Sequence, residues 1–249
     1  METILKIDLY LHITAGTVAL ITGMIAIFAK KGGLSHRKAG QWYFWAMLTV
    51  CVTAILRFRL SPSIIFLTMI AIFSFYLNFS GKRILNFKKK DKPFQFIDWS
   101  MAYFTLSCGI VMCLSSIYYY FFEHKTILSI LFVVFGFFCI SIARTDILRF
   151  KGKIEVEKMN WFFQHIGRMM GSYAATVTAF VITNNHGFFP DLVVWIAPGV
   201  IIGFLSDVWA NRYRKDYGIP IIPVLPVRIA QRFLGMFKQL NGNIVSFFK

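Results

Sequence analysis

The amino-acid sequence predicts an all-α integral membrane protein, a seven-transmembrane-helix bundle with a C-terminal interfacial amphipathic helix. The chain of 249 residues contains seven apolar segments, each about long enough to cross a bilayer as a helix. Hydrophobic residues make up 57% of the chain and charged residues 15%, whereas soluble domains carry roughly a quarter charged residues. The lysines and arginines gather in alternate loops between the apolar segments, as they do in multi-pass membrane proteins.

The apolar segments follow one another with short loops, which leave no room for a second, soluble domain. We place them at about 9–30, 39–57, 62–80, 96–121, 126–143, 159–183 and 192–210. Each approaches the roughly 20 residues that a helix needs to span the hydrocarbon core. We therefore expect one transmembrane domain, residues 1–217, and a tail, residues 218–249.

The loop charges predict the orientation. Counted from an external N-terminus, the outer side carries only Lys6, Arg57, Arg59 and Lys125, and the other loop lysines and arginines fall on the inner side. By the positive-inside rule the N-terminus lies outside and the C-terminus in the cytoplasm, as expected for a bacterial inner-membrane protein. The first segment has no basic region before it and no small-residue cleavage site, so we expect it to remain as the first span.

The excess of positive charge indicates which partners to expect. The formal net charge is +16, but the basic residues lie in loops and form no patch interleaved with aromatic residues, so no nucleic-acid partner is predicted. The expected partners are the lipid bilayer and anionic lipid at its cytoplasmic face.

The tail is expected to lie on the inner membrane surface. Pro220, Pro223 and Pro226 prevent a regular helix after the seventh segment. From 227 to 240 the apolar residues, Phe233 among them, share one helical face and the basic residues the other, which is typical of an interfacial helix attracted to anionic lipid. A helix that binds a partner protein is the alternative.

Small residues mark the faces on which transmembrane helices pack, because they permit close approach. Four predicted helices carry such stripes. They are Ala15, Ala19 and Gly23 in the first; Asp98, Ala102, Thr105, Gly109, Met112 and Ser116 in the fourth; His165, Arg168, Ser172, Ala175 and Ala179 in the sixth; and Gly199, Gly203, Asp207 and Asn211 in the seventh.

Polar residues near the predicted cytoplasmic helix ends are the candidate site. Intramembrane ionisable residues are costly unless they face other helices, so they are functional candidates by default. The set is His36, Arg37, Asp98, Arg144, Asp146, His165, Arg168 and Asp207. We expect these residues to line a pocket that opens to the inner leaflet; an ion-paired belt that only packs the helices is the alternative. His12, near the outer end of the first span, is a further candidate, or a hydrogen-bonded packing residue.

Three groups of residues carry a family resemblance: His12-x3-Gly16-x6-Gly23, then Lys31-Gly32-Gly33-x2-His36-Arg37-x2-Gly40, then Tyr43-x3-Met47. Together with His165 and Gly171-Ser172-Tyr173 they resemble a family of bacterial predicted multi-pass membrane proteins of unknown function. The resemblance implies a multi-pass fold over the seven-helix region and emphasises these residues. It implies no substrate.

The leading functional hypothesis is a small-ligand or cofactor site with a redox use. His36 and His165 lie at similar depth on different helices, as the axial pair of one b-type haem would require, and the arginines could pair with haem propionates.

Three alternatives stay open. In a zinc-dependent intramembrane hydrolase, His36, His165 and one aspartate would hold the metal and an activated water; hydrolases of the ceramidase and adiponectin-receptor type carry a His-x3-His pair on the last span, which this chain lacks. A proton-coupled transporter would use the inner cluster as a gate, although unbroken helices and the lack of a repeat argue against it. A structural or assembly role needs no ligand.

Overall fold

The computed structural model describes residues 2–88, 93–154 and 159–224. These residues form α1 (Glu2–Phe28), α2 (Leu34–Leu56), α3 (Pro62–Arg83), the 3-10 helix η1 (Ile84–Lys88), α4 (Phe96–Phe121), α5 (Thr126–Phe150), α6 (Asn160–Thr183) and α7 (Asp191–Asp216). The predicted all-α fold is confirmed. Each predicted apolar segment corresponds to one helix. The predicted interfacial helix at 227–240 lies outside the described residues.

Six of the described helices are long and apolar enough to cross a membrane: all except α6. α6 falls outside this group although it is 24 residues long. The polar residues of its first half, Asn160, Gln164, His165 and Arg168, lower its hydropathy. The structure therefore supports a multi-pass membrane protein.

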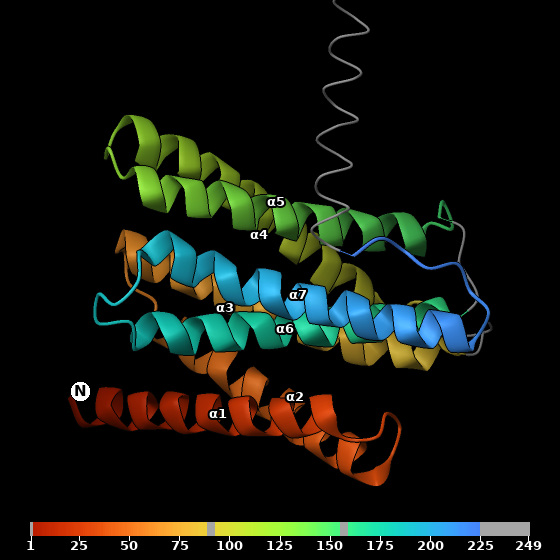
Figure 1. Ribbon diagram of the computed structural model, residues 1–249. Helices are drawn as coiled ribbons and strands as arrows, with labels where there is room; N and C mark the ends of the chain where they lie inside the picture. The colour runs from red at the N-terminus through yellow and green to blue at the C-terminus, as the bar shows by residue number, and fades with distance from the viewer. Residues whose placement is uncertain (1, 89–92, 155–158, 225–249) are drawn as a thin grey trace, which may run out of the picture.

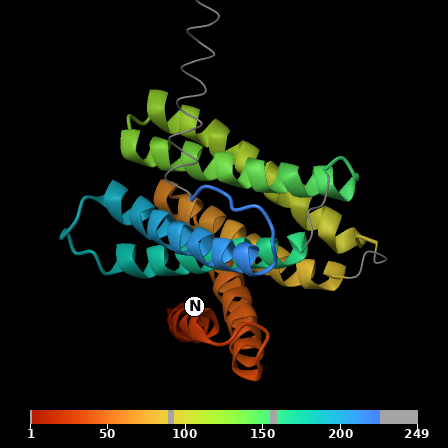
Figure 2. The ribbon, with the colours of Figure 1, turned by 45° about the vertical axis from the view of Figure 1, so that its right-hand side comes forward.

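The helices stack in three layers (Figure 1). α1 and α2 form one outer layer, α4 and α5 form the other, and α3, α6 and α7 lie between them. The main packing partners are α4 with α5, α1 with α2, α6 with α7, and α3 with α6. Figure 2 shows the same order from a second direction. Residues on α3 and α6 are therefore the ones that can meet both outer layers.

The stripe predicted on α4 is confirmed over the whole helix. All six of its residues are buried, from Asp98 to Ser116. At Gly109 a Cβ atom would lie 2.9 Å from the carbonyl oxygen of Gly136 and 2.8 Å from Cβ of Cys139. These two glycines let the backbones of α4 and α5 come into direct contact, which is how small residues bring membrane helices together.

The stripe predicted on α7 is not the buried face. Gly199 is exposed, and Gly203, Asp207 and Asn211 are half-buried. α7 buries another face instead, with Val194, Trp195, Pro198, Ser206 and Arg214. The α6 prediction holds only in part: Ser172 is buried, Ala179 is exposed, and other positions around the helix are buried as well. α6 has neighbours on several sides, so one stripe cannot describe it.

Five residues of the family resemblance meet where α1, α2 and α6 pack. The hydroxyl groups of Tyr43 and Ser172 are 2.8 Å apart, and the Tyr173 hydroxyl donates to the Leu20 carbonyl at 3.2 Å. Gly23 lies so close to Tyr173 that a Cβ there would be 2.4 Å from its ring. These motif residues therefore have a packing role. Tyr43 and Met47 are both buried in this contact.

Candidate functional site

Asp146 is the centre of a buried ionic cluster. It lies in the last turns of α5, 2% exposed, and receives hydrogen bonds from Tyr76 of α3 at 2.6 Å and from Arg149 at 2.9 Å. Arg168 of α6 donates to both carboxylate oxygens, one bond at 2.6 Å and the second to Oδ1. A buried carboxylate is tolerated when it is paired and hydrogen-bonded in this way. The cluster ties α3, α5 and α6 together.

Asp98 forms a separate pair at the start of α4. Arg83, the last residue of α3, binds its carboxylate with two hydrogen bonds, at 2.8 and 2.7 Å. The backbone nitrogen of Gln95 donates to the same carboxylate at 2.8 Å, and together they form a capping box. A carboxylate in the first helical turn also suits the helix dipole. Asp98 therefore has a complete structural role.

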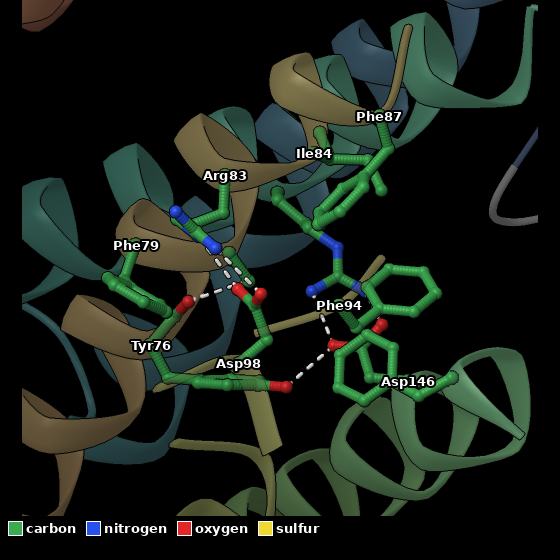
Figure 3. A pocket seen from close by; sticks show the side chains of 11 residues that line it. Tyr76, Phe79, Arg83, Ile84, Phe87, Phe94, Asp98 and Asp146 are labelled. Atoms are coloured by element: carbon green, nitrogen blue, oxygen red, sulfur yellow. Dashed lines mark hydrogen bonds and ion pairs between the residues drawn. The ribbon is translucent and has the colours of Figure 1, made fainter. Parts of the chain in front are cut away.

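The two ionic groups flank a small cavity. Figure 3 shows Arg83 on Asp98 at one side and Tyr76 reaching toward Asp146 at the other, with the rings of Phe87 and Phe94 close by. The cavity has a volume of about 20 Å³. A single water molecule needs roughly 10–15 Å³ by this measure, so the cavity is far too small for an organic ligand.

His36 and His165 come together, as predicted. Their ring centroids are 6.2 Å apart and the rings are nearly perpendicular. Nδ1 of His36 bonds the Ala26 carbonyl and Nδ1 of His165 bonds the Gly81 carbonyl, both at 2.8 Å. A carbonyl oxygen can only accept, so each Nδ1 carries a proton, and Nε2 is the nitrogen that would bind a metal when the ring is neutral.

Lys31 adds a positive charge beside this pair. Its ammonium group donates hydrogen bonds to the Ala26 carbonyl, at 3.2 Å, and to the Ile27 carbonyl. The Ala26 carbonyl also accepts the hydrogen bond from His36. Lys31 lies in the loop between α1 and α2, and partial burial lowers its pKa. The surroundings of the histidine pair are therefore basic.

Of the remaining candidates, Arg37, Arg144 and His12 do not join these groups. Arg37 and Arg144 are exposed, and Asp207 is half-buried on α7 and lines neither of the two cavities described. His12 lies toward the other end of the bundle, where its Nδ1 is 2.7 Å from the hydroxyl of Thr53. The single inner pocket that we expected from the sequence is therefore divided, with the histidine pair apart from the ionic cluster.

The zinc hypothesis required His36, His165 and one aspartate in a single group. Within residues 2–88, 93–154 and 159–224, no three His, Cys, Asp or Glu side chains are placed to hold a metal ion. Asp98 and Asp146 are instead bound to arginines. The expected three-residue zinc site is thus not assembled.

A second cavity, of about 450 Å³, lies between α3, α5, α6 and α7. Most of its wall is apolar, including Phe73, Leu77, Phe135 and Trp195. Its volume falls in the range of about 300–1,000 Å³ that is usual for small-molecule sites.

One end of this larger cavity, near the end of α5 and the start of α6, is polar. Arg149, Gln164 and Arg168 line it there. The Nε atom of Arg149 and the Oε1 atom of Gln164 are buried and have no hydrogen-bond partner in the described part of the chain. The amide nitrogen of Gln164 donates to Asn160 at 2.9 Å, which leaves Oε1 as the open acceptor. Unpaired buried polar atoms are uncommon in proteins and call for an explanation.

Sequence reasoning missed Tyr76, Arg83, Arg149 and Gln164. The predicted segments 62–80 and 126–143 end too early, since α3 continues to Arg83 and α5 to Phe150. Arg83 and Arg149 were therefore assigned to loops. Arg149 follows Asp146 by three residues, and this i,i+3 spacing on a continued helix was the signal for the pair.

Comparison of the chain with family models, with curated proteins and with solved structures finds no match.

Proposed function

We propose that this chain is a seven-span protein of a bacterial inner membrane, with its C-terminus in the cytoplasm, that binds a small ligand in the cytoplasmic half of the bundle. Membership of the family of predicted multi-pass membrane proteins is part of the proposal. The ligand site is the 450 Å³ cavity, with Arg149, Gln164 and Arg168 at its polar end. The observation that supports it best is that two of the four buried side-chain atoms without a hydrogen-bond partner in the described residues, Nε of Arg149 and Oε1 of Gln164, belong to residues that line this cavity.

The seventh crossing is α6. Its 24 residues make a helix of about 36 Å, longer than the roughly 30 Å hydrocarbon core. Its polar residues do not need to face lipid: Arg168 binds Asp146 of α5 and His165 binds the Gly81 carbonyl of α3. A helix enclosed by other helices can carry such residues through a membrane.

Filling the cavity tests ligand binding. Gly199 lines it, and a Cβ added there meets no atom within 4 Å, so Gly199→Phe should place a ring in the cavity without disturbing the helices. Gly16→Phe is the matched control, because Gly16 is equally open and lies on α1, away from the cavity. Small molecules extracted from the purified proteins are compared by mass spectrometry.

We expect at least one molecule that the wild type and Gly16→Phe retain and Gly199→Phe loses. Retention of the same molecules in equal amounts by all three proteins would contradict the proposed function, as would a wild type that carries detergent alone.

A second candidate function is electron transfer through one b-type haem held by His36 and His165. His36 and His165 would hold the haem iron, because two histidines on different helices are a usual ligand pair for a b-type haem and their ring centroids lie 6.2 Å apart. The hydrogen bonds from Nδ1 to the Ala26 and Gly81 carbonyls are the kind that orient metal-binding histidines. Lys31 would pair with a propionate.

The visible spectrum tests this candidate. The wild type purified from haem-supplemented cells should show reduced-minus-oxidised bands, and both His36→Ala and His165→Ala should lose them. His12→Ala is the control, since His12 lies elsewhere in the bundle and should keep them. A wild-type spectrum without these bands would exclude the haem.

A further inference from the structure

The charges around the large cavity do not balance. The charged residues of its described wall are Arg149 and Arg168, both positive. Arg168 binds both oxygens of Asp146, and Arg149 shares the same carboxylate through one Nη1 bond of 2.9 Å. One carboxylate thus pairs with two guanidinium groups, so this buried cluster carries a net charge of one positive unit. Such a charge is costly unless something neutralises it.

The unpartnered atoms specify where the missing charge belongs. The side chain of Arg149 is only 10% exposed, and its free Nε–H can be satisfied only by an acceptor. The free Oε1 of Gln164 can be satisfied only by a donor such as a hydroxyl. Both residues line the same cavity, so one occupant with an anionic group and a neighbouring hydroxyl would satisfy both atoms once the two side chains turn toward it.

The rest of the cavity is apolar and elongated. Its wall runs along α5 from Phe135 to Arg149, and along α6 from Gln164 to Thr178. Fourteen residues of helix rise about 21 Å, some two-thirds of the roughly 30 Å hydrocarbon core. A volume of about 450 Å³ spread over this length is narrow, so it suits one hydrocarbon chain better than two.

The cavity is open on its side, between α5 and α7. The close packing partners of α5 are α4 and α3, whereas α6 and α7 reach α5 through side chains, with Arg168 on Asp146 and Trp195 beside Phe135. Phe138 of α5, which is 50% exposed, and the exposed Gly199 of α7 both line the cavity and reach the surface on this side. Both belong to helices that are long and apolar enough to cross a membrane, so in the proposed bilayer this side of the cavity faces lipid.

We propose that the ligand is a single-chain lipid with a negatively charged head group, which enters from the inner leaflet between α5 and α7. The head group binds Arg149 and Gln164, and the chain extends past Leu77 toward Phe135 and Trp195. The proposal rests on the proposed function, because it names the ligand class of that same cavity. A fatty-acid carboxylate and a lysophosphatidate share this chemistry; only the second brings a glycerol hydroxyl to Gln164.

Trp195 provides a direct readout, because it lies at the far end of the cavity wall. Bromine on a hydrocarbon chain quenches tryptophan fluorescence on contact. The probes are stearate brominated at mid-chain, the lysophosphatidate that carries the same chain, and the uncharged alcohol of that chain. Each is titrated into the protein in neutral detergent. The difference between the wild type and Trp195→Phe isolates the quenching of this one tryptophan.

We expect saturable Trp195 quenching by both anionic probes and at least tenfold weaker binding of the uncharged alcohol. Arg149→Gln should weaken both anionic probes roughly ten- to hundredfold, as the loss of a charge-assisted hydrogen bond does. Arg144→Gln is the matched control: it removes an exposed arginine of the same helix and should change neither. Gln164→Leu should weaken only the lysophosphatidate.

Two results would overturn the inference. If the alcohol binds as tightly as the anions, or if Arg149→Gln binds them as well as the wild type does, the ligand is not selected by charge. The proposed function would survive both results, since Gly199→Phe could still displace a neutral ligand. If no probe gives saturable quenching of Trp195, and Gly199→Phe retains the same extracted molecules as the wild type, both the ligand class and the proposed function are contradicted.

Discussion

At the scale of single residues, the buried charged side chains differ in how completely they are hydrogen-bonded. Asp98 is held by Arg83 and by its own helix cap, and Asp146 is held by two arginines and a tyrosine. These pairs explain why charged residues can lie in a chain that is 57% hydrophobic. Arg149 differs from the others because part of its guanidinium group has no partner.

Removal of Arg168 should destabilise the protein. Arg168→Met leaves Asp146 buried with only Arg149 and Tyr76, so we expect a loss of about 3 kcal/mol, at the low end for a broken buried pair. Thermal unfolding in detergent measures it. Arg144→Met, an exposed arginine on α5, should be close to neutral.

The double variant Asp146→Asn/Arg168→Met should be no more stable than Arg168→Met, because it also removes the carboxylate that Arg149 binds and leaves that buried positive charge unpaired. Equal melting temperatures for Arg168→Met and Arg144→Met would show that the ionic cluster does not support the fold.

At the scale of helices, close contact decides which surfaces are buried. α4 and α5 meet at Gly109 and Gly136, where each glycine would place a Cβ within 2.9 Å of its neighbours. α7 makes no such contact at Gly199, because a Cβ atom added there would meet no atom within 4 Å. The same residue type therefore marks a helix crossing on α4 and the rim of a cavity on α7.

A methyl group at Gly109 should separate α4 from α5. Gly109→Ala puts Cβ 2.9 Å from a backbone carbonyl that cannot move aside, and overpacking of this kind costs about 1–3 kcal/mol. Gly167→Ala is the control, since no atom lies within 4 Å of its Cβ and helix propensity favours alanine by roughly 1 kcal/mol. Thermal unfolding should show opposite shifts; a loss in both variants would contradict the packing argument.

At the scale of the whole molecule, three layers of helices form one bundle, and the loop charges suggest how it sits in the membrane. The first turns of α2 and the last turns of α3, α5 and α7 are basic, with Lys38, Lys82, Arg149 and Lys215 among their residues. Lys125, between α4 and α5, lies at the opposite end of the bundle. By the positive-inside rule we expect Lys38 to lie in the cytoplasm and Lys125 outside.

Cysteine labelling tests the orientation. Lys125→Cys should react with a membrane-impermeant maleimide in intact cells, and Lys38→Cys should react only after the cells are opened. The four native cysteines lie within apolar helices, so their background should be low. Labelling of Lys38→Cys in intact cells would reverse the proposed topology.

The sequence by itself determined the all-helical class, the positions of the seven helices and the buried face of α4. These features depend on local composition and periodicity: apolar runs set helix positions, and the regular 4,3 spacing of small residues identified Asp98, Ala102 and Gly109 as one face. It also placed His36 and His165 at similar depth, and their rings indeed meet.

Only the tertiary structure decided which polar residues meet. Arg149 and Gln164 lie on different helices, and nothing in the local sequence says that both open into one cavity. The helix ends were also misjudged, because the partner that allows Arg83 to stay helical, Asp98, is supplied by another helix. Contacts between helices depend on layer order and crossing points, and these are set by packing across the bundle, which no single segment contains.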